Sequence, residues 1–195
     1  MPLFARWRAE RDLRRRSGAY VATLLEEPSD ADVRWLAESA TRGDLDHARW
    51  ELRYARRAVG LIVAQRDALD DRTGSSVGRT LAEAFERDAN IASDRLAVAR
   101  HQFNARLGAY RDVLTSRPPA ARTAPGRPAV AQTSTRLGEL LLAFAGGRVG
   151  PHAREVPRAG EILTAYIDAA HQALRDAFGV ASLPEDVSPS ALQRS

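Results

Sequence analysis

The first candidate for chemistry is a serine between two glycines. Residues 74–78 read Gly-Ser-Ser-Val-Gly and match the G-x-S-x-G pattern, with Ser76 at the nucleophile position. In hydrolases that pattern follows a strand and precedes a helix, so that the turn exposes the serine hydroxyl at the edge of a sheet. Here a strong helical pattern precedes it. We therefore predict that Ser75 or Ser76 caps the following helix and is not catalytic.

Metal-ligating side chains are spread thinly along the chain. The four histidines, at 47, 101, 152 and 171, stand alone, and Glu51 follows His47 by four positions on the same helical face. A di-iron bundle needs paired Glu-x-x-His motifs on separate helices, and the sequence has none. We interpret His47 and Glu51 as a surface or half-buried pair, and we predict no metal site.

Two missing residue types exclude whole classes of enzyme. The chain has no Cys, and all 29 of its basic residues are Arg. Without cysteine there is no disulfide, thiolate metal site or cysteine nucleophile. Without lysine there is no Schiff-base lysine and no P-loop lysine. We predict no catalytic residues, no cofactor and no enzymatic activity.

Positive charge is concentrated in the first sixteen residues. They carry six Arg against Glu10 and Asp12, a net charge of +4, whereas the remaining residues carry 23 basic and 23 acidic side chains. Arginines interleaved with apolar residues are typical of a helix that lies on an anionic membrane or grips a polyanion. The alternative is that the arginines form an ordinary solvated face of a helix whose apolar side packs in the bundle. The candidate residues for anionic-surface binding are Phe4, Arg6, Trp7, Arg8, Arg11, Arg14, Arg15 and Arg16.

Helices must position these side chains, because apolar residues recur at steps of three and four and no useful strand alternation occurs. Residues 71–75 read as a tight turn, and a defect near 88–90 is expected to split the longest helical segment. The two long segments on either side of the turn should pack as an antiparallel hairpin. We expect helices over residues 3–26, from Ser29 or Asp30 to a C-cap at Gly43, and over 45–70, 77–116, 133–144 and 158–178.

The predicted fold is therefore all-α, an antiparallel helical bundle built on a long helical hairpin with an appended C-terminal helix pair. The predicted domains are a bundle (1–116), a Pro/Arg-rich linker (117–132), and C-terminal helices with a tail (133–195). The C-terminal helix pair is too small to form a hydrophobic core by itself. It should pack on the main bundle, on a partner or on a second copy of itself.

One stretch, residues 93–118, resembles the C-terminal signature helix of the LemA family. In that family an Ile, an Ala-Arg, two Tyr-Asn pairs around an aliphatic residue, and a closing Phe-Pro recur at fixed spacing. Arg111 replaces the second Asn, Arg117 replaces the Phe, and the family's membrane-spanning N-terminal segment is missing. The resemblance implies a helical scaffold and no particular chemistry. It is carried by Leu96, Ala99, Arg100, Phe103, Asn104, Leu107, Tyr110, Leu114 and Pro118.

Three functions follow from these features. The first is a non-enzymatic helical adaptor or accessory subunit that acts through a protein partner or self-association. The second is a peripheral membrane protein that docks its basic N-terminal helix on an anionic surface. The third is nucleic-acid binding. The neutral charge of the remaining residues and the lack of a recognised binding motif argue against it. With no signal-peptide core and no apolar stretch of eighteen residues, we expect a cytoplasmic or membrane-peripheral location.

Overall fold

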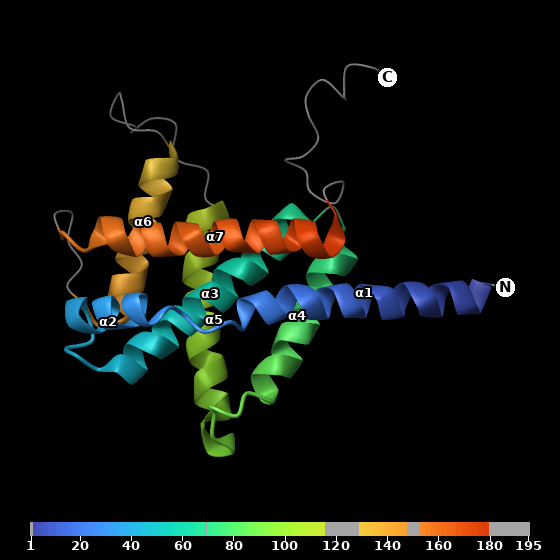
Figure 1. Cartoon of the computed structure of the whole chain (residues 1–195), viewed down its shortest axis with the longest axis horizontal. Helices are drawn as coiled ribbons and strands as arrows, with labels where there is room; N and C mark the ends of the chain where they lie inside the picture. The colour runs from blue at the N-terminus through green and yellow to red at the C-terminus, as the bar shows by residue number, and fades with distance from the viewer. Residues whose placement is uncertain (1, 69, 116–128, 148–152, 180–195) are drawn as a thin grey trace. The chain divides into compact units, whose positions relative to one another are not determined.

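The computed structural model describes residues 2–68, 70–115, 129–147 and 153–179, and the side chains of 2–5 and 129–131 are left out of that description. Over these ranges the chain is helical and contains no strand, which confirms the all-α prediction (Figure 1). None of the helices combines the length and the apolar character that crossing a membrane requires. The elements are α1 (Pro2–Leu24), α2 (Asp30–Ser39), α3 (Leu45–Asp67), α4 (Asp71–Glu86), a 3-10 turn η1 (Ser93–Arg95), α5 (Leu96–Thr115), α6 (Ala129–Phe144) and α7 (Val156–Phe178).

The predicted turn at residues 71–75 is wrong, and so is the predicted serine cap. Asp70 is the N-cap of α4, because its Oδ1 accepts a hydrogen bond from the Thr73 backbone amide at 2.6 Å. The helix therefore begins at Asp71, and Ser75 and Ser76 lie inside it. Aspartate satisfies the free amides at a helix start as well as serine does, so both residue types were candidates for this role.

The other helix ends follow the sequence more closely. The Ser29 Oγ accepts from the Asp32 amide at 3.1 Å and caps α2, as predicted. Gly43, at φ 88°, donates its amide to the Ala37 carbonyl at 2.8 Å, although α2 already ends at Ser39. The break near 88–90 is confirmed, since α4 ends at Glu86 and η1 precedes α5.

The C-terminal helices begin earlier than predicted. Helix α6 starts at Ala129, inside the stretch 117–132 that we predicted to be a linker, and α7 starts at Val156. Helix α7 ends at Phe178, before Gly179 at φ 89°, as predicted. The rest of the predicted linker and the tail after position 179 lie outside the described residues.

The chain forms two compact units, each assembled from segments that are distant in sequence. Unit 1 comprises Met1–Glu26, Gly60–Leu96 and Asp168–Ser195, and unit 2 comprises Glu27–Val59 and Ala97–Ile167. Helices α3 and α7 therefore contribute residues to both units. The predicted domain boundaries at 117 and 133 do not coincide with this division. The second arm of the predicted hairpin is also divided, because α4 belongs to unit 1 and nearly all of α5 to unit 2.

Unit 1 is held together by a close approach of α1 to α3. The Tyr20 hydroxyl donates to the Gly60 carbonyl at 2.7 Å, and burial raises the pKa of this phenol above its ordinary range. Gly60 must lack a side chain here, since a Cβ would overlap the side chain of buried Leu24. Helix α1 also packs against α4, where Val77, Leu81 and Phe85 are buried. This packing fixes the second half of α1.

A buried carboxylate links α3 to the end of α7 in the same unit. The Asp67 Oδ2 lies 2.8 Å from His171 Nε2, and Arg66 donates from Nε and Nη2 to the two carboxylate oxygens at 2.5 and 2.7 Å. Burial alone raises the pKa of Asp67. The hydrogen bonds from His171 and Arg66 outweigh that effect and hold the pKa below its ordinary value of 3.8.

Replacing Asp67 with asparagine tests this cluster through its pH dependence. Because the pKa is lowered on folding, the charge of Asp67 stabilises the protein fully above the unfolded value, and this stabilisation is lost as the pH falls through the folded value. We expect the difference in free energy of unfolding between the wild type and D67N to be largest above about pH 5 and to shrink steadily toward about pH 2. Urea denaturation followed by circular dichroism at a series of pH values measures it. A difference that stays constant over this range would contradict the role of the charge.

Unit 2 contains α6 and the part of α7 up to Ile167. Arg158 of α7 pairs with Asp32 of α2 at 2.8 Å, and the Phe144 ring of α6 meets the Tyr110 ring of α5 edge-on, with centroids 5.9 Å apart. Of the three expected positions for the C-terminal helix pair, the structure shows packing on the other helices of the chain. Its core is filled by residues from five helices (α2, α3, α5, α6 and α7): Leu36, Leu52, Tyr110, Leu137, Leu141, Leu142 and Leu163.

Helices α6 and α7 cross at a pair of glycines. A Cβ at Gly160 would stand 2.5 Å from the Ser134 carbonyl oxygen and 2.6 Å from its Oγ, and a Cβ at Gly138 would overlap the Val156 carbonyl oxygen. These neighbours are mainly backbone atoms, which cannot swing aside as a side chain can. The absence of side chains at 138 and 160 therefore sets the distance between the two helices.

Candidate functional site

The structure gives Ser76 no catalytic partner. It lies in α4, and its Oγ accepts a hydrogen bond from Ser17 Oγ of α1 at 2.8 Å. Across the described part of the chain, no histidine or carboxylate lies within hydrogen-bond distance of Ser76 to remove its proton. Without a general base a serine hydroxyl is a weak nucleophile. The G-x-S-x-G match is thus a stretch of ordinary helix.

His47 and Glu51 do form a pair, but the stronger partner of Glu51 was missed by the sequence reasoning. His47 Nε2 lies 3.5 Å from Glu51 Oε1, whereas Arg106 of α5 donates from Nε at 3.0 Å and from Nη2 at 2.5 Å to the same carboxylate. The Glu51 side chain is 4% exposed and that of Arg106 is 12% exposed. Their separation of 55 residues hid this contact from helical-spacing arguments. Within the described ranges, no group of three or more potential ligands could hold a metal ion.

The predicted anionic-surface residues lie on the part of α1 that precedes Ser17. The buried residues of this helix begin at Ser17 and continue through Tyr20, Val21 and Leu24, so that only the second half is fixed in the core. Figure 1 shows the first turns of α1 running on past its crossing with α4. Seven of the eight predicted residues are exposed there, and the side chain of the eighth, Phe4, is outside the description. We call these seven the α1 arginine surface: Arg6, Trp7, Arg8, Arg11, Arg14, Arg15 and Arg16.

Trp7 is the most exposed large apolar side chain of the described residues, at 60%. The Arg11 guanidinium carbon lies 5.5 Å from the centre of its ring, within the range of a cation–π contact. The arginine therefore covers part of one ring face, and the rest of the ring is open to solvent. An exposed indole among arginines is an amphipathic surface of the kind found at membrane interfaces.

Acidic neighbours neutralise only part of this surface. Arg15 and Arg16 pair with Asp12 at 2.6 and 2.7 Å. The hydrogen bond from Arg15, with the nearby arginine charges, lowers the pKa of Asp12 despite some desolvation. Arg6, Arg8 and Arg14 make no ion pair with any residue that the structure describes. Together with Arg11 they present four positive charges that no described acidic side chain pairs with.

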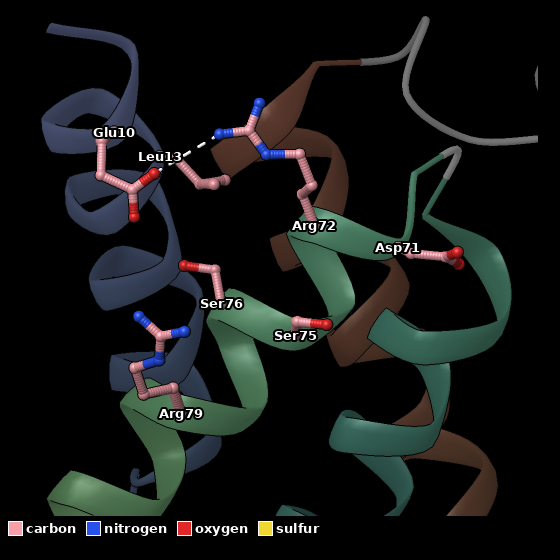
Figure 2. A pocket seen from close by; sticks show the side chains of 7 residues that line it. All are labelled: Glu10, Leu13, Asp71, Arg72, Ser75, Ser76 and Arg79. Carbon is pink, nitrogen blue, oxygen red and sulfur yellow. Dashed lines mark hydrogen bonds and ion pairs between the residues drawn. The ribbon is translucent and has the colours of Figure 1, made fainter. Parts of the chain in front are cut away.

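A polar pocket of about 260 Å³ lies between α1 and α4, next to this surface (Figure 2). Arg72, Ser76 and Arg79 recur at steps of four and three on α4, and Figure 2 shows all three side chains directed toward α1. Glu10 of α1 reaches Arg72 at 3.4 Å, while Asp71 points away from α1. The sequence reasoning missed this pocket, because its residues lie on one face of α4 only if residues 71–75 are helical. The lining residues are Glu10, Leu13, Asp71, Arg72, Ser75, Ser76 and Arg79.

Comparison with protein-family models, with curated proteins and with solved structures finds no match to this chain. The resemblance of residues 93–118 to the LemA family therefore stays a prediction that rests on one helix. Function has to be inferred from the exposed surface of α1 and the pocket beside it.

Proposed function

We propose that the protein attaches peripherally to an anionic membrane surface through the α1 arginine surface. The observation that carries this proposal is the exposure of Trp7 beside Arg6, Arg8 and Arg11, which form no ion pair with the residues described. Leaving an indole in water is unfavourable, and its amphipathic ring is well suited to the headgroup level of a bilayer. Arginine forms bidentate hydrogen bonds with phosphate groups, which line that level.

The magnitude of the electrostatic attraction is adequate for reversible docking. Each basic residue near an anionic leaflet contributes about 1 kcal/mol, so four uncompensated arginines supply roughly 4 kcal/mol, or about a thousandfold in the binding constant. Burial of the Trp7 ring adds to this. One amphipathic segment of this size gives attachment that salt or a change of lipid composition can reverse.

Two other functions predicted from the sequence have less support in the geometry. The adaptor hypothesis was motivated by a C-terminal helix pair without a core of its own, whereas α6 and α7 pack against other helices of the chain. Nucleic-acid binding gains little from a single exposed tryptophan, because single-strand binding uses a platform of several aromatic residues. Binding to duplex DNA rests mainly on contacts to phosphates and needs no apolar anchor.

Co-sedimentation with vesicles tests the proposal. We expect the wild type to bind phosphatidylcholine vesicles that contain phosphatidylserine, and not to bind pure phosphatidylcholine vesicles. The double variant R8Q/R11Q should lose about thirtyfold in affinity, on the basis of about 1 kcal/mol per arginine. The variant W7A should also bind more weakly, because the indole contributes apolar contact that alanine cannot replace.

A matched control removes two positive charges from elsewhere in unit 1. Arg87 and Arg95 are each 75% exposed and lie away from α1 in sequence, and R87Q/R95Q should bind vesicles nearly as the wild type does. If R8Q/R11Q and R87Q/R95Q lose affinity equally, the attraction is a matter of net charge and the proposed surface is wrong. Tight salt-dependent binding of duplex DNA without vesicle binding would favour the nucleic-acid alternative.

A further inference from the structure

We propose that the pocket between α1 and α4 binds a phosphate group. This inference does not depend on membrane docking, since Arg72, Ser76 and Arg79 lie on α4 and take no part in the α1 arginine surface. The phosphate could belong to a lipid headgroup or to a soluble phosphorylated compound. Both present the same oxygens to the pocket.

Arg79 and Ser76 supply hydrogen-bond donors that have no acceptor among the residues described. Arg79 makes no ion pair and no hydrogen bond with its side chain among the residues described. Ser76 accepts a hydrogen bond from Ser17, so its own hydroxyl hydrogen is left to donate, and the described chain offers it no acceptor. Donors that no described protein group accepts, gathered on one wall of a pocket, favour a ligand made of acceptor oxygens.

Helix α4 presents these donors together on the wall of the pocket. Positions 72, 76 and 79 lie on one face of a helix, so that two guanidinium groups flank one hydroxyl (Figure 2). Guanidinium groups bind phosphate through two parallel charge-assisted hydrogen bonds. The pocket volume of about 260 Å³ far exceeds the roughly 30 Å³ that one water molecule occupies in the liquid. It can therefore admit a phosphate together with part of the group that it esterifies.

Of the two acidic residues that line the pocket, Glu10 is the one that contacts Arg72. The Glu10 carboxylate reaches Arg72 at 3.4 Å, longer than a strong ion pair, and both side chains are largely exposed. A phosphate carries more charge than a carboxylate and competes with it for Arg72. Glu10 thus opposes an anionic ligand by repulsion and by holding Arg72. Removing its charge should strengthen binding, which is the opposite of what loss of a ligand-binding residue does.

Titration of the full chain with inorganic phosphate, followed by calorimetry, tests the proposal. We expect saturable binding by the wild type and a loss of about tenfold or more in R79Q, as for removal of a hydrogen bond to a charged group. S76A should lose a few fold, and E10Q should gain affinity. The control R87Q, which removes an exposed arginine near the other end of α4, should bind as the wild type does. Circular dichroism and thermal unfolding of each variant show whether it is folded.

Vesicles distinguish the two sources of phosphate. A lipid source predicts that R79Q weakens binding to vesicles that contain phosphatidic acid, whose headgroup is a phosphomonoester. A soluble source predicts that R79Q weakens binding of inorganic phosphate and leaves vesicle binding unchanged. The pocket proposal is overturned if the wild type shows no saturable phosphate binding, or if folded R79Q and E10Q bind as the wild type does. The membrane-docking proposal is tested separately, by the binding of R8Q/R11Q to vesicles that contain phosphatidylserine.

Discussion

Replacing Arg106 with methionine is expected to lower the free energy of unfolding by about 3–5 kcal/mol, the cost of leaving a buried charge without its partner. The Glu51 side chain is almost completely buried, and Arg106 supplies two hydrogen bonds to its carboxylate. The same guanidinium lies 4.7 Å from the Phe144 ring centre and 5.4 Å from that of Tyr54. Methionine keeps much of the packing and removes the charge. Urea denaturation followed by circular dichroism measures the loss.

A double variant separates the ion pair from the packing. If the cost of R106M comes from the orphaned carboxylate, E51L/R106M should recover most of the lost stability, because well-packed apolar pairs often replace buried ion pairs without penalty. Arg136 of α6 is exposed and has no ion pair among the residues described, so R136M should change stability by no more than about 0.5 kcal/mol. A double variant as unstable as R106M would show that the arginine acts by packing alone.

The second large effect is expected at the crossing of α6 and α7. In G160A the new methyl group meets the Ser134 carbonyl oxygen and hydroxyl, so the helices must separate, and we expect a loss of about 1–3 kcal/mol, as for other overpacked sites. Gly108 of α5 provides the matched control, since a Cβ there meets nothing within 4 Å. G108A should stabilise the protein by up to about 1 kcal/mol through helix propensity. Thermal unfolding distinguishes them, and equal effects of the two substitutions would contradict the close crossing.

The sequence predicted helices well because each helix shows its own apolar period. The long α3 and the break between α4 and α5 followed from residues close together in the chain. The start of α4 did not, because Asp70 and the two serines are all good N-cap residues, and in the structure the cap is Asp70. Because residues 71–75 were predicted to be a tight turn, the prediction did not place Arg72 and Ser76 on one face of a helix.

The candidate site was predictable only in part for the same reason. The arginines of α1 are visible as a local cluster of charge, and their exposure follows from the absence of large apolar partners early in the helix. The contribution of Arg79 depends on the packing of α4 against α1, which pairs residues about sixty positions apart. The contact of Glu51 with Arg106 likewise joins residues that are far apart in the sequence, 55 positions from one another. Charge pairs between helices leave no periodic signal in a single sequence.

The sharing of α3 and α7 between the two units has a consequence for how the protein folds during synthesis. Val156–Ile167 complete unit 2 and the following residues of α7 contribute buried Ala170 and Leu174 to unit 1. Neither core can therefore close when its first helices leave the ribosome, although multidomain chains commonly fold from the N-terminus onward. The parts of both cores that α7 covers stay open until this helix, which begins at Val156, has been made. Nascent chains stalled before residue 156 should accordingly be the species most in need of a chaperone.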